Sequence, residues 1–130
     1  MGRSVELSDV VPEIERFGAL ATLISVGELG EPHVGSVLVE VGDERLVVRV
    51  GPTTAANLSR LPAVSLSWLP SNGGDYQLIV DGAAETDGDP DGDGLIPVRV
   101  EVRKGILHRL AGRNDAGPTC LPLRNGADRV

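Results

Sequence analysis

The sequence is poor in cysteine and in aromatic residues. Cys120 is its one cysteine, so an internal disulfide bond and a zinc site built from several cysteines are both excluded. This cysteine usage favours a reducing compartment. The aromatic residues of the chain are Phe17, Trp68 and Tyr76. Proteins that bind single-stranded nucleic acid usually stack bases on aromatic side chains, and this chain has few to offer.

Basic residues are also in the minority. The chain has 12 Lys and Arg residues against 19 Asp and Glu residues, which gives a formal net charge of -7 at pH 7. Nucleic-acid readers usually carry a basic face that neutralises phosphates. We therefore expect no nucleic-acid partner.

Long hydrophobic runs are missing as well. No apolar segment approaches the ~20 residues that span a bilayer, and charges at Glu6 and Asp9 interrupt the apolar residues near the N-terminus. We therefore expect no membrane partner, and we expect a cytoplasmic protein.

The chain has the size and composition of one ordinary domain. Its 130 residues are 41% hydrophobic and 24% charged, and a domain of this length buries roughly two-thirds of its unfolded surface. Periodicity is clear up to about residue 110. Beyond it the sequence is rich in Gly, Pro, Asn and Asp, so we expect a domain over 1–110 and an irregular tail over 111–130.

Two short segments have the pattern of helices. The first is expected to have Ser8 or Asp9 as its cap, to bury the face that carries Val10, Ile14 and Phe17, and to end at Gly18. The second is expected to have Thr53 as its cap and to run through Arg60.

The rest of the regular pattern is that of strands. Apolar residues alternate with polar ones, or form short runs, and turn residues separate the segments. The expected strands cover residues 19–26, 33–41, 45–50, 64–68, 76–85, 98–103 and 106–110. We expect a turn at Lys104 and Gly105 between the last two, and a meander of the first three. Six or seven short strands with two short helices predict a mainly β protein, with a closed or nearly closed antiparallel barrel.

The order of these segments resembles the pyridoxamine 5'-phosphate oxidase-like, flavin-binding split-barrel family. The resemblance runs from about Phe17 to Arg109. Four segments carry it: 18–23 (GALATL), 30–34 (GEPHV), 53–58 (TTAANL) leading into 61–64 (LPAV), and 105–109 (GILHR).

The resemblance implies a homodimer with two equivalent cofactor grooves at the subunit interface. It implies FMN as the cofactor, or a deazaflavin coenzyme as in some bacterial branches, or haem in a few cases. The implied reaction is oxidation or reduction of a small organic substrate, with the cofactor carrying the electrons.

A phosphorylated cofactor needs hydrogen-bond donors and positive potential. The start of the helix at Thr53 supplies backbone N–H groups and a helix dipole, and Arg49 lies just upstream. The candidate cofactor-binding residues are Ser36, Arg49, Val50, Gly51, Thr53, Thr54, Asn57 and Trp68. Each also has a structural interpretation: Thr53 and Thr54 as helix caps, Asn57 as a partner of nearby backbone, and Trp68 as a core or interface residue.

The chain departs from the family in the first turn of this helix. Family members commonly place a lysine or arginine there, whereas this chain has Thr54, Ala55 and Ala56. Loss of one charged hydrogen bond weakens binding by about 1.5–3 kcal/mol. A second hypothesis is therefore a non-enzymatic member of the fold that serves as a small-ligand-binding or sequestering module.

Other motifs point to no chemistry. Residues 87–94 (DGDPDGDG) resemble part of a calcium loop, but counting from Asp89, position 12 is Val100 rather than glutamate, so we expect a solvated turn and no metal site. His33 and His108 are expected to be surface or structural residues. The sequence assigns no catalytic residue.

Overall fold

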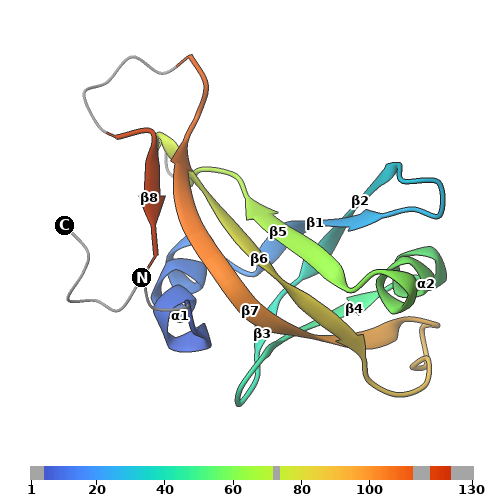
Figure 1. The fold of residues 1–130 in the computed structure, drawn as a ribbon. Coiled ribbons are helices and arrows are strands. Elements are labelled where there is room, and N and C mark those ends of the chain that lie inside the picture. Colours follow the sequence, from blue (N-terminus) through green and yellow to red (C-terminus); the bar gives the residue numbers. More distant parts are fainter. Residues whose placement is uncertain (1–4, 72–73, 113–117, 124–130) are drawn as a thin grey trace.

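The structure is a computed structural model that describes residues 5–71, 74–112 and 118–123. Two helices and eight strands make up its regular structure (Figure 1). In chain order they are α1 (Leu7–Phe17), β1 (Leu20–Val26), β2 (Pro32–Leu38), β3 (Glu40–Val41), β4 (Leu46–Val50), α2 (Pro52–Arg60), β5 (Ala63–Trp68), β6 (Tyr76–Thr86), β7 (Ile96–Arg109) and β8 (Cys120–Pro122). Neither helix of the described chain has the length and apolarity that a bilayer crossing requires.

The strands form one curled antiparallel sheet. Seven strands follow the order β2-β1-β5-β6-β7-β4-β3, and β8 pairs with β7 outside this path. Figure 1 shows the sheet curling on itself, with α1 and α2 toward opposite ends. The predicted fold class, a mainly β antiparallel barrel with two short helices, is confirmed.

The two edges of the sheet are joined by the chain itself. β2 and β3 stand at opposite ends of the strand order, yet Val39 alone separates them in the sequence. The segment 33–41, expected as one strand, therefore pairs with β1 in its first part and with β4 in its last part. Among the described residues no ladder pairs β2 with β4, and this opening is the split of the barrel.

The inner face of the sheet forms the core. Strand residues alternate between buried and accessible positions, as in β4, where Leu46, Val48 and Val50 point inward. The fully buried large side chains are Val10, Leu23, Leu46, Val48, Leu58, Leu66, Trp68, Leu78, Val80, Val98, Val100 and Leu123. Burial of each such side chain contributes about 1.5–3 kcal/mol.

Both helices begin earlier than predicted. α1 has Glu6 as its N-cap, and the Glu6 N–H donates to the Asp9 carboxylate at 2.8 Å, so neither Ser8 nor Asp9 is the cap. α2 has Gly51 as its N-cap and Pro52 at its first position. The prediction of a Thr53 cap was wrong. Proline, with its fixed φ and no N–H, is well suited to the first helical position, so the helix begins at Pro52 and its cap is the preceding Gly51.

Strand β7 runs through the turn predicted at Lys104 and Gly105. Asp81 pairs with Lys104 but Gly82 pairs with Val102, so β7 contains one extra residue at this point. The expected turn is a β-bulge, which bends a strand without ending it. The two strands predicted over 98–103 and 106–110 are therefore one.

Part of the predicted irregular tail is ordered. β8 pairs with residues 106–108 of β7, and Leu123 is buried in the core. Within the segment expected as an irregular tail, Cys120–Pro122 forms a short strand, whereas 113–117 and 124–130 lie outside the described residues. The domain boundary near residue 110 stays a prediction.

Candidate ligand groove

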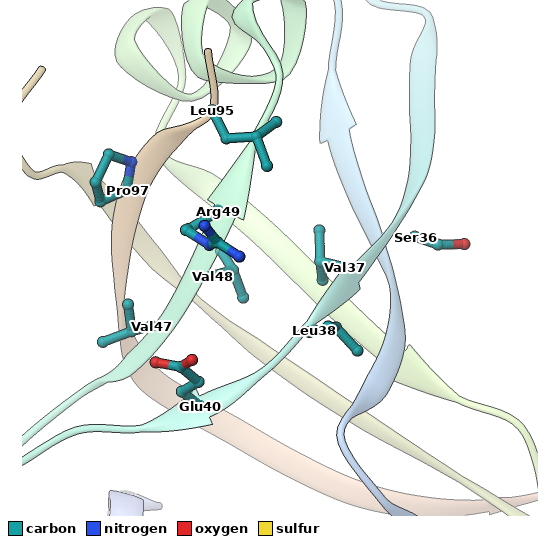
Figure 2. A pocket seen from close by; sticks show the side chains of 9 residues that line it. All are labelled: Ser36, Val37, Leu38, Glu40, Val47, Val48, Arg49, Leu95 and Pro97. Atoms are coloured by element: carbon teal, nitrogen blue, oxygen red, sulfur yellow. The ribbon is translucent and has the colours of Figure 1, made fainter. Parts of the chain in front are cut away.

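A groove of about 300 Å³ lies at the split of the barrel. Its walls come from β2 and the start of β3 on one side, and from β4 and the start of β7 on the other (Figure 2). The lining residues are Ser36, Val37, Leu38, Glu40, Val47, Val48, Arg49, Leu95 and Pro97.

Most of this lining is apolar. Val37 and Val48 are buried at its base, and Leu95 points toward the opening between the strands in Figure 2. The polar members are Ser36, Glu40 and Arg49. Apolar walls with a few polar groups are typical of sites for small organic molecules.

Arg49 lies on the outer side of β4, between the buried Val48 and Val50. Its Nη1 donates to Oδ2 of Asp91 at 3.0 Å, across 42 residues of sequence. The β4–β7 ladder pairs Arg49 with Pro97, so the loop that leads into β7 lies beside the arginine. The groove therefore holds its positive charge as an ion pair.

Asp91 is fixed by its own loop. Its Oδ1 accepts hydrogen bonds from the backbone N–H groups of Asp93, at 2.8 Å, and Leu95, at 3.0 Å. These backbone hydrogen bonds, and after them the hydrogen bond and charge of Arg49, hold the pKa of Asp91 below its ordinary value. The carboxylate beside Arg49 is therefore ionised at neutral pH.

Several candidate residues continue from Arg49 into α2 without lining the groove. Val50 is buried, Gly51 caps the helix, and Thr53 is exposed in the first turn. The side chain of Thr54 is buried. Of the predicted cofactor-binding residues, the structure brings Ser36 and Arg49 to the groove, although Ser36 points away from Arg49 in Figure 2.

Asn57 and Trp68 lie elsewhere and make structural contacts. Asn57 donates to Oγ of Ser25 at 3.2 Å and accepts from Arg60 at 3.1 Å. Trp68 is buried and donates its indole N–H to the Gly18 carbonyl oxygen at 2.8 Å. Neither side chain lines the groove. The contacts of Trp68 agree with its core interpretation, whereas Asn57 bonds to side chains rather than to the nearby backbone.

Sequence reasoning missed the second wall of the groove. Leu95 and Pro97 follow the acidic loop and are far from Arg49 in the sequence. They reach the groove because the β4–β7 ladder pairs Arg49 with Pro97. Glu40 and Val47 also line the groove and were not predicted. The alternation of residues 45–50 placed Val47 on the same accessible side as Arg49, and this pattern could have identified Val47 as a lining residue.

The described part of the chain contains no cluster of three or more His, Cys, Asp or Glu side chains suited to a metal ion. In the loop 87–94, the carboxylate of Asp91 is engaged by Arg49 and by two backbone N–H groups. Nδ1 of His108 lies 2.9 Å from the carbonyl oxygen of Arg109, its own neighbour in the chain.

Comparison with known proteins identifies close relatives of this chain, although no family model matches it. The uncharacterized protein Mb0449c of Mycobacterium bovis is 39% identical over 118 residues, which cover 78% of this chain and 80% of that protein. The uncharacterized protein MT0457 of Mycobacterium tuberculosis matches to the same extent, at 39% identity over 118 residues.

Solved structures with the same fold are more distant in sequence. A putative pyridoxamine 5'-phosphate oxidase from Listeria innocua gives a TM-score of 0.63 at 16% identity, over 78% of this chain and 98% of that one. A heme-binding protein from Mycobacterium smegmatis gives 0.63 at 18% identity, over 88% and 58%. An F420 reductase gives 0.59 at 19% identity, over 67% and 89%. The chain belongs to one family with the two mycobacterial proteins, and it has the split-barrel fold of the pyridoxamine 5'-phosphate oxidase-like proteins, as its sequence indicated.

Proposed function

We propose that the protein is a flavin- or deazaflavin-dependent oxidoreductase that acts on a small organic substrate, with the cofactor in the groove at the split of a homodimer. The observation that carries this proposal is the groove itself. It combines apolar walls from β2, β4 and β7 with Arg49, one residue before the end of the strand that leads into α2.

The residues of the groove fit the ring of such a cofactor. Leu38, Val47 and Leu95 offer an accessible apolar surface against which a flat ring packs and from which water is excluded. When bound, the cofactor supplies the hydride or electron transfer, while the chain binds and orients it.

The donors for an anionic tail come from Arg49 and the first turn of α2. The first hydrogen bond of the helix runs from the N–H of Ala55 to the carbonyl oxygen of Gly51. The N–H groups of Thr53 and Thr54 precede it and lie at the positive end of the helix dipole. This donor set suits an anion but includes no basic side chain from the helix's first turn, where the sequence reads PTTA.

An apolar outer face supports the homodimer. Leu20 pairs with Leu38 and Ile24 with Val34 across the β1–β2 ladder. These four side chains, which we call the outer β1–β2 face, are 65%, 61%, 36% and 61% exposed in the order given. The polar pair Thr22–Ser36 lies between the two apolar pairs on this face. Exposed apolar side chains gathered on one face commonly mark protein interfaces.

The outer β1–β2 face adjoins the groove through Leu38, which belongs to both. A second copy seated on this face would therefore add a wall to the groove. The groove of one chain, at about 300 Å³, is at the lower end of the range for ligand sites, in agreement with a site completed by the partner.

The second candidate function is the non-enzymatic ligand-binding module. The observation that favours it is the charge at the groove: Arg49 is already paired with Asp91, and the first turn of α2 carries no basic residue. The similar structures are named for different ligands, F420 and heme, so the shared fold does not choose the cofactor. For both candidate functions we propose a cytoplasmic protein, because the free, exposed thiol of Cys120 would stay reduced in that compartment.

An absorption spectrum of the protein as purified, read beside thermal unfolding with FMN, FAD, deazaflavin, haem and pyridoxal phosphate, separates the candidates. The oxidoreductase proposal predicts a yellow protein, or one that flavin or deazaflavin stabilises and Arg49→Gln weakens. A colourless protein stabilised by none of these compounds would favour the second candidate. The matched control is Arg103→Gln, because Arg103 is exposed and pairs with Glu101 rather than facing the groove.

A further inference from the structure

Arg49 is the one basic side chain among the residues that line the groove. Its ion pair with Asp91 is partly open to water, with the side chains 52% and 27% exposed. An incoming anion can therefore reach the guanidinium, but it meets a carboxylate already bound there. Glu40, on the opposite wall, places a negative charge in the groove itself.

Asp91 is held in place by contacts that do not involve Arg49. Besides the two bonds to its Oδ1, the Asp91 N–H donates to the Leu95 carbonyl oxygen at 2.7 Å, and the Gly94 N–H donates to the Asp91 carbonyl oxygen at 2.9 Å. Leu95, in turn, lines the groove. The carboxylate is thus fixed beside Arg49 by the same turn that contributes Leu95 to the groove.

We propose that Asp91 determines which ligands the groove accepts, by competing with anionic groups for Arg49 and so favouring ligands that carry no phosphate over their phosphorylated forms. This inference rests on the proposed function in one respect: it takes the groove as the ligand site. A fixed carboxylate beside Arg49 repels a phosphate and leaves fewer Arg49 donors for it. An uncharged ring packs against the apolar walls without meeting this competition.

FMN and riboflavin test the inference, because they share one ring and differ by a phosphate. The variant is Asp91→Asn, whose side-chain oxygen still accepts the two backbone N–H bonds while the negative charge is lost. The matched control is Asp89→Asn, which removes a charge from an exposed residue of the same loop. Affinities are measured by quenching of flavin fluorescence at low and high salt.

We expect Asp91→Asn to bind FMN about fivefold more tightly than the natural protein, as befits a partly exposed charge, with riboflavin affinity unchanged. The gain should shrink at high salt, because salt screens exposed charges, and should vanish in the Arg49→Gln, Asp91→Asn double variant. The inference is overturned if Asp91→Asn gains no more than Asp89→Asn, or if both flavins change equally.

Pyrophosphate provides a readout that needs no flavin. If no variant binds either flavin, the flavin proposal fails, and thermal unfolding with pyrophosphate still decides the inference. A larger stabilisation of Asp91→Asn than of the natural protein, lost on Arg49→Gln, supports Asp91 as the competing anion. Equal stabilisation of the two proteins contradicts it.

Discussion

Asn57 donates a hydrogen bond to the hydroxyl of Ser25 at 3.2 Å, and both side chains are buried. The bond connects the middle of α2 to the C-terminal end of β1. Arg60 extends it, because its Nη2 bonds both the side-chain oxygen of Asn57 and the carbonyl oxygen of Val26. Asn57, one of the candidate cofactor-binding residues, is thus part of the connection between helix and barrel.

Replacement of Asn57 by alanine is expected to destabilise the fold by about 1–3 kcal/mol, because it leaves the Ser25 hydroxyl and one Arg60 bond without their partner. Chemical denaturation measures the loss. Ser59→Ala, on the exposed side of the same helix, is the control and should change stability little. A loss for Asn57→Ala no larger than for the control would contradict this role.

Gly105 is required by packing rather than by a turn. A Cβ built there would lie 2.8 Å from Cγ1 of Val10 and 3.1 Å from Cδ1 of Leu123. Gly105→Ala is therefore expected to cost about 1–3 kcal/mol through overpacking between β7, α1 and the residue after β8. Gly35→Ala is the matched control, since a Cβ at that strand position meets nothing within 4 Å. Equal urea midpoints for the two variants would contradict the packing argument.

The outer β1–β2 face predicts a dimer that one charge disrupts. Leu38→Asp places a carboxylate in the apolar Leu20–Leu38 pair of the proposed interface, twice per dimer by symmetry. We expect the dissociation constant to rise at least about a hundredfold, since each buried leucine contributes roughly 1.5–3 kcal/mol. Sedimentation equilibrium measures the change. Leu29→Asp, in the exposed turn between β1 and β2, should leave the association intact; a protein that is monomeric before any substitution contradicts the homodimer.

The lowered pKa of Asp91 predicts that the stability of the loop before β7 depends on pH. Its pKa lies below the ordinary value of 3.8, chiefly because of the backbone bonds from Leu95 and Asp93. A carboxyl group with a depressed folded-state pKa stabilises the fold above its unfolded pKa, and this contribution is lost as the pH falls through the folded pKa. We expect the carboxyl ¹³C resonance of Asp91 to titrate with a midpoint below 3.8. A midpoint at or above that value would contradict the hydrogen bonds described for this loop.

Much of the barrel was predictable from the sequence, because strand alternation follows directly from which face is buried. The pattern of Val98, Val100 and Val102 was correct on this ground. The turn predicted at Gly105 was wrong because a glycine can serve either a turn or a close approach of neighbouring side chains. The contacts of Val10 and Leu123 show that Gly105 serves close packing.

The candidate site was predictable only in part. Arg49 was found because it sits on the exposed face of a strand before a helix. Its pairing with Asp91 was not, since the two residues meet only through the β4–β7 register. That long-range pairing also brings Leu95 and Pro97 to the groove, and no local pattern encodes it.

The proposed ligand site is tested most directly by mapping where a flavin binds, from ¹⁵N chemical-shift changes on titration with FMN and riboflavin. We expect the shifts to concentrate at the residues of the split, namely 36–40, 47–49 and 95–97, and Arg49→Gln to reduce those caused by FMN. Shifts gathered instead around the surface formed by Arg16, Phe17 and Tyr76, or no shifts with either flavin, would contradict it.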